Sequence, residues 1–78
     1  MILTIYIKDN CETCLSLIQK LDGLKLSDYG FNYEAINVSN NPFAKTSVVP
    51  ALFCGNEILA FGEADILNKI RMALFTNV

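Results

Sequence analysis

The sequence predicts an α/β fold in which a four-stranded mixed sheet is flanked by helices. Three observations predict it: an N-terminal run of β-branched and aromatic residues, two stretches whose apolar residues recur with helical spacing, and a hairpin signal at Gly55-Asn56. The chain has 78 residues, of which 53% are apolar and 18% are charged. This length and composition predict one compact domain spanning residues 1–78.

The first third of the chain is predicted to form a strand and a helix. Ile2–Ile7 is largely apolar on both faces, which is typical of a central strand covered on two sides. Asp9-Asn10 is a pair of good N-cap residues, so we expect a helix to begin at about Cys11. Gly23 and Gly30 are alternative ends for this helix, and the apolar pattern is compatible with both.

The middle of the chain is predicted to hold a second strand and a short second helix. Phe31–Val38 alternates apolar and polar side chains, as a strand does. A helical crossover joins it to the first strand, so the two strands should be parallel. Residues 39–42 read as a helix cap followed by proline, which predicts one helical turn over Phe43–Thr46.

The last third of the chain predicts a hairpin and a final helix. Val48–Cys54 is expected to form a third strand with a proline near its start, where no sheet hydrogen bond is lost. Glu57–Phe61 should return antiparallel to it through the two-residue turn. Apolar residues at helical spacing then predict an amphipathic helix that begins at Glu63 or Ala64 and ends at Phe75.

The charge and the absence of histidine exclude several kinds of chemistry. The net charge is −2, so no electrostatic attraction to nucleic acid or acidic lipid is expected. The chain has no His, which removes Ser-His and Cys-His catalytic pairs and every zinc site that needs an imidazole. Acid–base or metal chemistry would therefore have to come from Cys, Asp, Glu, Lys or Tyr.

The sequence also carries an expectation about location. The apolar start, Met1–Ile7, is short and has no basic residue before it, so it resembles a strand rather than a signal peptide. No apolar run approaches the roughly 18 residues that span a bilayer. The three cysteines are an odd number, unlike the even set of a secreted disulfide scaffold. These features predict a cytoplasmic protein without a membrane partner.

Cys11-Glu12-Thr13-Cys14 is the most informative motif because it places two thiols at the start of a helix. Residues three apart lie on adjacent turns of one helix face, close enough for the two sulfur atoms to bond. Cys11 would sit at the helix N-terminus, where free N–H groups and the helix dipole favour a thiolate. The motif therefore predicts Cys11 as the nucleophile and Cys14 as the resolving thiol.

Other interpretations of the cysteines stay open. A zinc site would need two more ligands, whereas only Cys54 is left and the chain has no His. Two unrelated buried cysteines, or an iron–sulfur cluster shared by two chains, are further alternatives. Cys54 itself is expected to be a small buried hydrophobe within its strand, with a regulatory thiol as the alternative.

Together these motifs resemble those of glutaredoxins, and most of all the small phage glutaredoxins and the glutaredoxin-like hydrogen donors of ribonucleotide reductase. The cysteine motif follows the first strand, Val49-Pro50 stands near the start of the third, and Gly62 with Asp65 opens the last helix. The resemblance covers essentially the whole chain, in the β-α-β-α-β-β-α order of the thioredoxin fold with a short second helix. It implies a single glutaredoxin-like domain.

The resemblance assigns roles to individual residues. It implies that Cys11 is the exposed nucleophile and Cys14 its buried partner. Lys8 matches the basic residue that favours the thiolate and meets the carboxylate of glutathione. The further substrate-contacting positions that the resemblance implies are Thr13, Val49, Pro50, Gly62 and Asp65.

Four of these positions form two pairs, and the resemblance gives each pair a defined role. Val49 and Pro50 match a Val–cis-Pro pair, in which the backbone of Val49 bonds an incoming peptide as an added strand. Gly62 and Asp65 match the segment that holds the γ-glutamyl end of glutathione. These roles are expectations from the resemblance.

The chain departs from the family pattern between the cysteines. Glu12-Thr13 replaces the usual Pro-Tyr, and this change should alter local rigidity and redox potential. Glu12 and Asp9 place negative charge near Cys11 and oppose Lys8 and the helix dipole. We therefore expect the pKa of the Cys11 thiol to be lowered, but less than in a member with neutral neighbours.

Three further departures concern the glutathione site. Val48 stands where the family has Thr, Phe61 replaces the first Gly of a Gly-Gly pair, and Ala64 replaces a carboxylate or hydroxyl. These changes remove polar contacts to glutathione and weaken the expectation that glutathione is the reductant. Phe61 itself is expected in the core, with the lining of the substrate groove as the alternative.

The sequence thus predicts a monomeric thiol–disulfide oxidoreductase that reduces protein or mixed disulfides through Cys11 and Cys14, with ribonucleotide reductase as one candidate acceptor of its electrons. Glutathione or thioredoxin reductase would reduce it, and no metal or organic cofactor is required. One alternative is a protein that holds a [2Fe–2S] centre through Cys11 in a dimer. Another is a peptide-binding module whose thiols are incidental.

Overall fold

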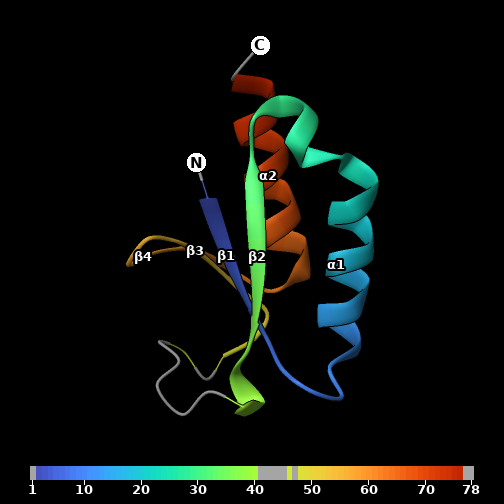
Figure 1. Cartoon of the computed structure of the whole chain (residues 1–78), viewed down its shortest axis with the longest axis vertical. Helices are drawn as coiled ribbons and strands as arrows, with labels where there is room; N and C mark the ends of the chain where they lie inside the picture. Colours follow the sequence, from blue (N-terminus) through green and yellow to red (C-terminus); the bar gives the residue numbers. More distant parts are fainter. Residues whose placement is uncertain (1, 41–45, 47, 77–78) are drawn as a thin grey trace.

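The computed structural model describes residues 2–40, 46 and 48–76 of the chain. The elements follow one another in an alternating order (Figure 1). They are β1 Ile2–Ile7, α1 Glu12–Leu24, the 3₁₀ helix η1 Leu26–Tyr29, β2 Asn32–Asn37, the 3₁₀ turn η2 Val38–Asn40, β3 Ala51–Cys54, β4 Glu57–Phe61 and α2 Glu63–Thr76. The predicted α/β fold with a four-stranded mixed sheet and flanking helices is confirmed.

The strands pair in the order β2-β1-β3-β4, so β1 and β3 are the central strands. β1 runs parallel to β2, with Ile5 opposite Ala35, and antiparallel to β3, with Ile5 also opposite Leu52. β3 and β4 form the predicted antiparallel hairpin around Gly55. The central place of β1 explains why both of its faces are apolar.

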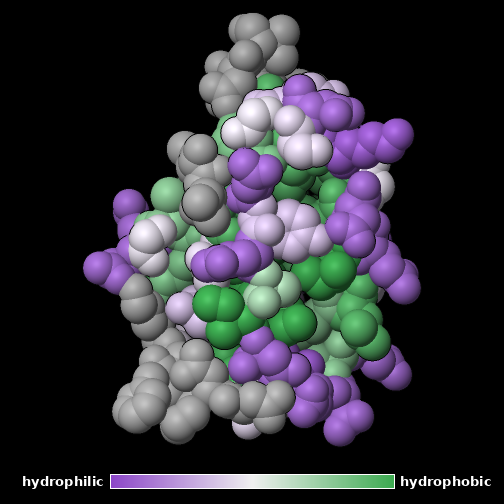
Figure 2. Space-filling view, viewed as in Figure 1, coloured by the Kyte–Doolittle hydropathy of each residue, from purple (hydrophilic) through white to green (hydrophobic). Residues whose placement is uncertain are grey.

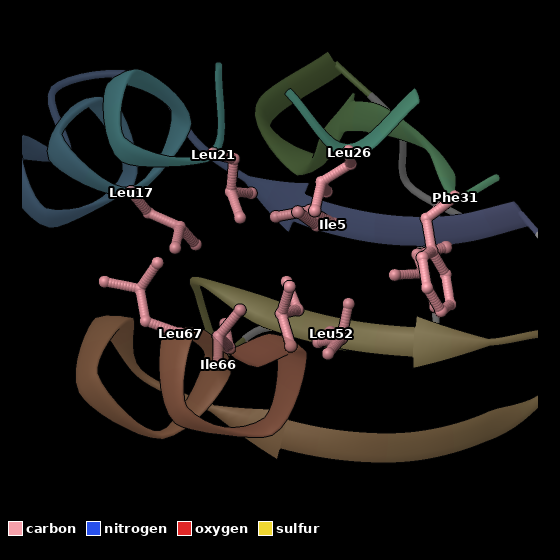
Figure 3. Packing of buried hydrophobic residues seen from close by; sticks show 10 residues of the cluster. Ile5, Leu17, Leu21, Leu26, Phe31, Leu52, Ile66 and Leu67 are labelled. Atoms are coloured by element: carbon pink, nitrogen blue, oxygen red, sulfur yellow. The ribbon is translucent and has the colours of Figure 1, made fainter. Parts of the chain in front are cut away.

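Both long helices pack on the same face of the sheet and build the main core with it (Figure 3). Leu17 and Leu21 of α1 meet Ile66 of α2 above Ile5 and Leu52 of the central strands, and each of these side chains is at most 1% exposed. Complete burial of one such side chain contributes about 1.5–3 kcal/mol to folding. The apolar residues that recur with helical spacing thus pack against the apolar residues of the central strands and form the main core.

The opposite face of the sheet carries a second, smaller apolar cluster. Tyr6 and Phe53 pack edge-to-face on it, with ring centroids 5.0 Å apart and ring planes at 80°. The residues half-buried against this cluster are Ile36, Val38 and Val49. Of the predicted short helix at 43–46, only Thr46 lies within the described residues, and it is not helical.

The first helical region consists of an α-helix that ends close to Gly23 and a 3₁₀ helix that ends before Gly30. Both of the predicted helix ends are therefore found in the structure. α1 continues past Gly23 to Leu24, and it stops because Lys25 adopts a left-handed conformation with φ 52°. η1 then extends the helical region to Tyr29, where Gly30, with φ 80°, caps it through hydrogen bonds to Leu26 and Ser27. A positive φ is accessible to Gly without steric cost, so Gly30 ends the region.

Two strands are shorter than predicted. β2 begins at Asn32 and ends at Asn37, one residue inside each predicted bound. β3 begins only at Ala51, because the backbone of residues 48–50 bends before it enters the sheet. The peptide bond between Val49 and Pro50 is cis, as the family resemblance implied.

Candidate active site

The segments named by the sequence meet at one end of the sheet, at the bottom of Figure 1. β1 leaves the sheet there after Ile7 and leads into α1. β3 enters the sheet at the same end, because Ala51 pairs with Tyr6 of β1, and β4 leaves it there, because Phe61 pairs with Ala51. Topology therefore brings the starts of α1 and α2 to the bend before β3. We call this the cysteine end.

Cys11 and Cys14 form a disulfide at the start of α1, with Cα atoms 5.2 Å apart. Cys11 is itself the N-cap, with extended backbone, and its Sγ accepts a 3.2 Å hydrogen bond from the Cys14 N–H. Thr13 Oγ1 lies 3.4 Å from the same sulfur. The N–H that now contacts the disulfide sulfur is a donor that would stabilise a Cys11 thiolate after reduction.

The two sulfur-bearing side chains differ in access less than the resemblance implied. Cys14 is 1% exposed, as expected for the resolving partner. Cys11 is 9% exposed, so the expectation of an openly exposed nucleophile is wrong for this oxidised form. Its bond to Cys14 and its role as the N-cap both turn the sulfur toward the protein.

The loop before Cys11 is tied to the end of β2. Asn37 Nδ2 donates a 2.8 Å hydrogen bond to Asp9 Oδ1, and the Asp9 N–H donates a 3.1 Å bond to Ser39 Oγ. The Ser39 N–H in turn donates to Asn37 Oδ1 at 2.8 Å. We call Asp9, Asn37 and Ser39 the Asp9 clamp. Asp9 is thus not the helix cap that the sequence predicted.

The same loop also contains Asn10 and Lys8. Asn10 adopts the left-handed conformation, with φ 57°, so it turns the chain into α1 instead of capping the helix. Lys8 has an exposed side chain at the end of β1. Its contact with a substrate carboxylate remains a prediction.

Pro50 and Gly62 are held together across the sheet end. The Gly62 N–H donates a 2.9 Å hydrogen bond to the Pro50 carbonyl, and the Gly62 carbonyl accepts from the Ile66 N–H at 3.0 Å. Gly62 has φ 85°, a conformation that favours glycine. Pro50 is buried, while Val49 is half-buried and lies just outside the β3 ladder.

Asp65, the last of the predicted site residues, lies near the start of α2. Its side chain is exposed on the first turn of α2. It lines a surface depression of about 300 Å³ whose other walls are Leu59, Ala60, Asn68, Lys69 and Met72. A contact of Asp65 with glutathione remains a prediction.

A contact that the sequence did not predict joins the second half of α1 to the first residue of α2. Lys20 Nζ of α1 lies 3.3 Å from Glu63 Oε2 of α2. A hydrogen bond from Ser16 lowers the pKa of Glu63 most, and Lys20 lowers it further against the opposing effect of desolvation. Ser16 and Lys20 are four residues apart on α1, a spacing that places them on one face, but nothing in the sequence identifies Glu63 as their partner.

Several apolar side chains are exposed toward the cysteine end. Val48 is 57% exposed just before Val49-Pro50, and Phe61 is 40% exposed just before Gly62. The expectation that Phe61 belongs to the core is therefore wrong. Leu15, which follows Cys14, is 65% exposed, and Figure 2 shows apolar side chains over the lower halves of α1 and β2.

The exposure of Phe61 follows from a register shift between β3 and β4. Phe53 pairs with Ile58 and Leu52 pairs with Ala60, so Leu59 is an extra residue in the ladder. Leu59 and Ala60 therefore both pack against the helix-covered core, whereas Phe61 faces the opposite side of the sheet. An unshifted period-two pattern does not reveal this.

The third cysteine takes no part in this arrangement. Cys54 is a free thiol at the end of β3, half-buried against the main core, in partial agreement with the predicted buried hydrophobe. Across the described residues, no group of three or more Cys, Asp or Glu side chains is placed to hold a metal ion. None of the described helices is long and apolar enough to cross a membrane.

Comparison with known proteins supports the fold. No protein-family model and no curated protein sequence matches the chain. Among solved structures, thioredoxin 1 from the thermophilic eubacterium Thermosipho africanus TCF52B superposes with a TM-score of 0.61 at 19% identity, covering 97% of both chains. A structure described as a malarial protein superposes with a TM-score of 0.57 at 19% identity, covering 91% of this chain and 93% of the other.

At this level of identity the likeness concerns the fold alone. The chain has a thioredoxin fold, and it carries a disulfide-forming cysteine pair at the start of its first helix. This combination supports a role in thiol–disulfide redox chemistry.

Proposed function

We propose that the chain is a dithiol–disulfide oxidoreductase of the glutaredoxin or thioredoxin type, which reduces disulfides through Cys11 and Cys14. The observation that carries the proposal is the disulfide between a helix N-cap sulfur and the buried sulfur one turn further on. A thiol at this position is activated by helix N–H groups, which replaces the histidine that the chain lacks.

The reaction balances with the two thiols alone. The Cys11 thiolate attacks a substrate disulfide, forms a mixed disulfide with one half and releases the other half as a thiolate, which takes up a proton. Cys14, after losing its proton, attacks the Cys11 sulfur and releases the second substrate thiolate. Two electrons have then passed to the substrate, and the protein holds the Cys11–Cys14 disulfide seen here.

The surroundings of the pair favour a protein as the disulfide substrate. Val48 precedes the Val49-Pro50 bend and Phe61 pairs with Ala51 just after it, and both side chains are exposed. Val49 lies outside the β3 ladder. An extended peptide could bond to the Val49 backbone and place an apolar side chain against Phe61. Lys8, Thr13 and Gly62 complete the proposed contact surface, with Asp65 at its margin.

The source of electrons and the cellular setting are part of the same proposal. Glutathione or thioredoxin reductase would return the pair to the dithiol form, and ribonucleotide reductase is one candidate acceptor. We propose a monomer that works in the cytoplasm without a metal or organic cofactor. The apolar residues at 48, 61 and 64 favour a protein reductase over glutathione, because they offer no polar group to the tripeptide.

Coupled turnover tests the proposal. The oxidised protein is supplied either with glutathione and glutathione reductase or with thioredoxin reductase, and NADPH oxidation is followed with a protein disulfide as the acceptor. We expect sustained turnover with at least one system. Absence of turnover with both, in a folded protein whose disulfide dithiothreitol can reduce, would contradict the proposed function.

A further inference from the structure

The Asp9 clamp determines where the negative charge of the Asp9 carboxylate lies relative to Cys11. Asp9 lies two residues before Cys11, and it is the acidic residue nearest in the chain on that side of the sulfur. Its carboxylate is nevertheless directed to Asn37, a partner 28 residues further along the chain. The clamp holds the Asp9 backbone as well, through the 3.1 Å bond to Ser39.

Without the clamp, the Asp9 carboxylate would have a competing partner. Free N–H groups at a helix start attract carboxylates, and residues just before the first turn are those that cap it. At α1 these donors include the Cys14 N–H, which contacts Cys11 Sγ. A carboxylate in this position would compete for the donor and place negative charge beside the sulfur. Both effects disfavour a thiolate.

We propose that Asn37 is a positioning residue for Cys11: it holds the Asp9 carboxylate at the end of β2 and so reserves the N-terminus of α1 for the Cys11 sulfur. Asn37 acts through Asp9 and touches neither cysteine in this role. The inference rests on the proposed function for its purpose, but its effect on the Cys11 thiolate is measurable without a substrate.

Other ionisable groups lie near the clamp in the chain, and none of them would account for a change in the Cys11 thiolate after substitution of Asn37. Those within three residues of its members in the chain are Tyr6, Lys8, Cys11, Glu12 and Glu34. Lys8 and Glu12 are exposed and of opposite sign, and Glu34 accepts a hydrogen bond from Thr4 Oγ1 at 3.4 Å. A substitution of Asn37 alters none of these charges. A change in the Cys11 thiolate after that substitution therefore reports on Asp9.

The test is the pH dependence of Cys11 alkylation. The reduced protein is treated with iodoacetamide across a pH series, and the Cys11 adduct is measured by mass spectrometry. Asn37→Ala should raise the Cys11 pKa by about half a pH unit, the effect of an exposed carboxylate brought within a few ångström of the sulfur. Below that pKa, alkylation should slow about threefold. The matched control, Asn32→Ala at the other end of β2, should leave the profile unchanged.

A second pair of variants shows whether Asn37 acts through Asp9. In an Asp9→Asn background the competing charge is gone, so Asn37→Ala should no longer shift the profile. A shift of unchanged size in that background, or no shift in the wild-type background, would overturn the proposal. Should Asn37→Ala fail to fold by circular dichroism, Ser39→Ala loosens only the backbone bond and should give a smaller shift in the same direction.

The result is separate from the test of function. Reductase turnover is measured in the coupled assay, whereas the thiolate is measured by alkylation alone. A protein without turnover that still shows the shift would contradict the proposed function and support the role of Asn37. Normal turnover with no shift would do the reverse.

Discussion

The two ends of the sheet are built from different interactions. Positive φ occurs at both ends, at Asn10 and Gly62 of the cysteine end and at Lys25 and Gly30 of the far end, whereas the cis bond before Pro50 belongs to the cysteine end. Polar contacts hold the segments of the cysteine end, among them the Asp9 clamp and the bond from Gly62 to Pro50. At the far end, at the top of Figure 1, η1 closes over the sheet and buries Leu26 and Phe31 in the main core.

The comparison indicates that the far end contributes mainly to the stability of the fold, whereas the cysteine end carries the proposed chemistry. The far end also carries an open depression of about 350 Å³, and Tyr33 at its wall donates a 2.7 Å hydrogen bond to Asp22. Apolar burial contributes most of the folding free energy, so substitutions at the far end should act on stability. Exposed polar contacts contribute little to stability, so those of the cysteine end are free to serve the chemistry.

The largest expected effect tests whether the chemistry lies entirely at the cysteine end. Cys11→Ser should abolish disulfide reduction, because the nucleophile is lost. Cys14→Ser should leave a mixed disulfide on Cys11 that mass spectrometry detects. Cys54→Ser is the control and should retain turnover, because Cys54 is a free thiol outside the disulfide. Turnover by Cys11→Ser would place the reactive group elsewhere.

The next effect tests the far end as a source of stability. Leu26 is 4% exposed, and Leu26→Ala should cost about 2–5 kcal/mol of unfolding free energy. Thermal unfolding measures this loss, and Ser27→Ala, at the exposed neighbouring residue, is the control. Below the unfolding transition, the alkylation profile of Cys11 should match that of the wild type. A changed profile would show that the two ends are coupled.

Substitution of Phe61 tests the apolar rim of the cysteine end. Phe61→Ala should lower kcat/KM for a protein disulfide about fivefold, since about 1 kcal/mol of apolar contact is lost. Reduction of glutathione disulfide should change little. Ile58→Ala is matched, because Ile58 is on the same strand and 50% exposed but lies further from Gly62. Equal losses in both variants would remove Phe61 from the contact surface.

A smaller effect is expected on the stability of the protein at high pH, and it comes from Tyr33 at the far end. Desolvation, followed by the hydrogen bond to Asp22 and its charge, raises the pKa of Tyr33 from 10.0 to about 12. The folded state therefore favours the protonated phenol, and this contribution is complete below about pH 10 and lost as pH rises toward 12. Tyr33→Phe should flatten the fall in stability across this range. Denaturant unfolding between pH 9 and 11.5 measures it.

The smallest effect is expected at the cysteine end at low pH. The hydrogen bond from Ser16 and the ion pair with Lys20 lower the pKa of Glu63, so its contribution is present above the carboxyl's ordinary pKa. It is lost as pH falls through the lowered value in the folded state. Glu63→Gln should make unfolding less sensitive to acid, whereas Glu57→Gln on β4 should not. An equal response of both variants would contradict a specific role for Glu63.

Much of the fold and the reactive pair were predictable because they depend on local patterns. Strand Ile2–Ile7 and the hairpin return Glu57–Phe61 are observed with the predicted bounds. The spacing of Cys11 and Cys14 predicted a disulfide because helix geometry alone brings residues three apart together. The strand, the hairpin and the cysteine spacing each depend on residues that are close together in the chain.

The partners of the exposed polar and apolar side chains were decided only by the tertiary structure. Asp9 looks like a helix cap in the sequence, yet it bonds Asn37 across two elements. Phe61 looks like core, yet the extra residue in β4 turns it outward. The physical reason is the same in both cases. A local preference worth about 1 kcal/mol yields to contacts made by residues distant in the chain, and those contacts exist only once the sheet has formed.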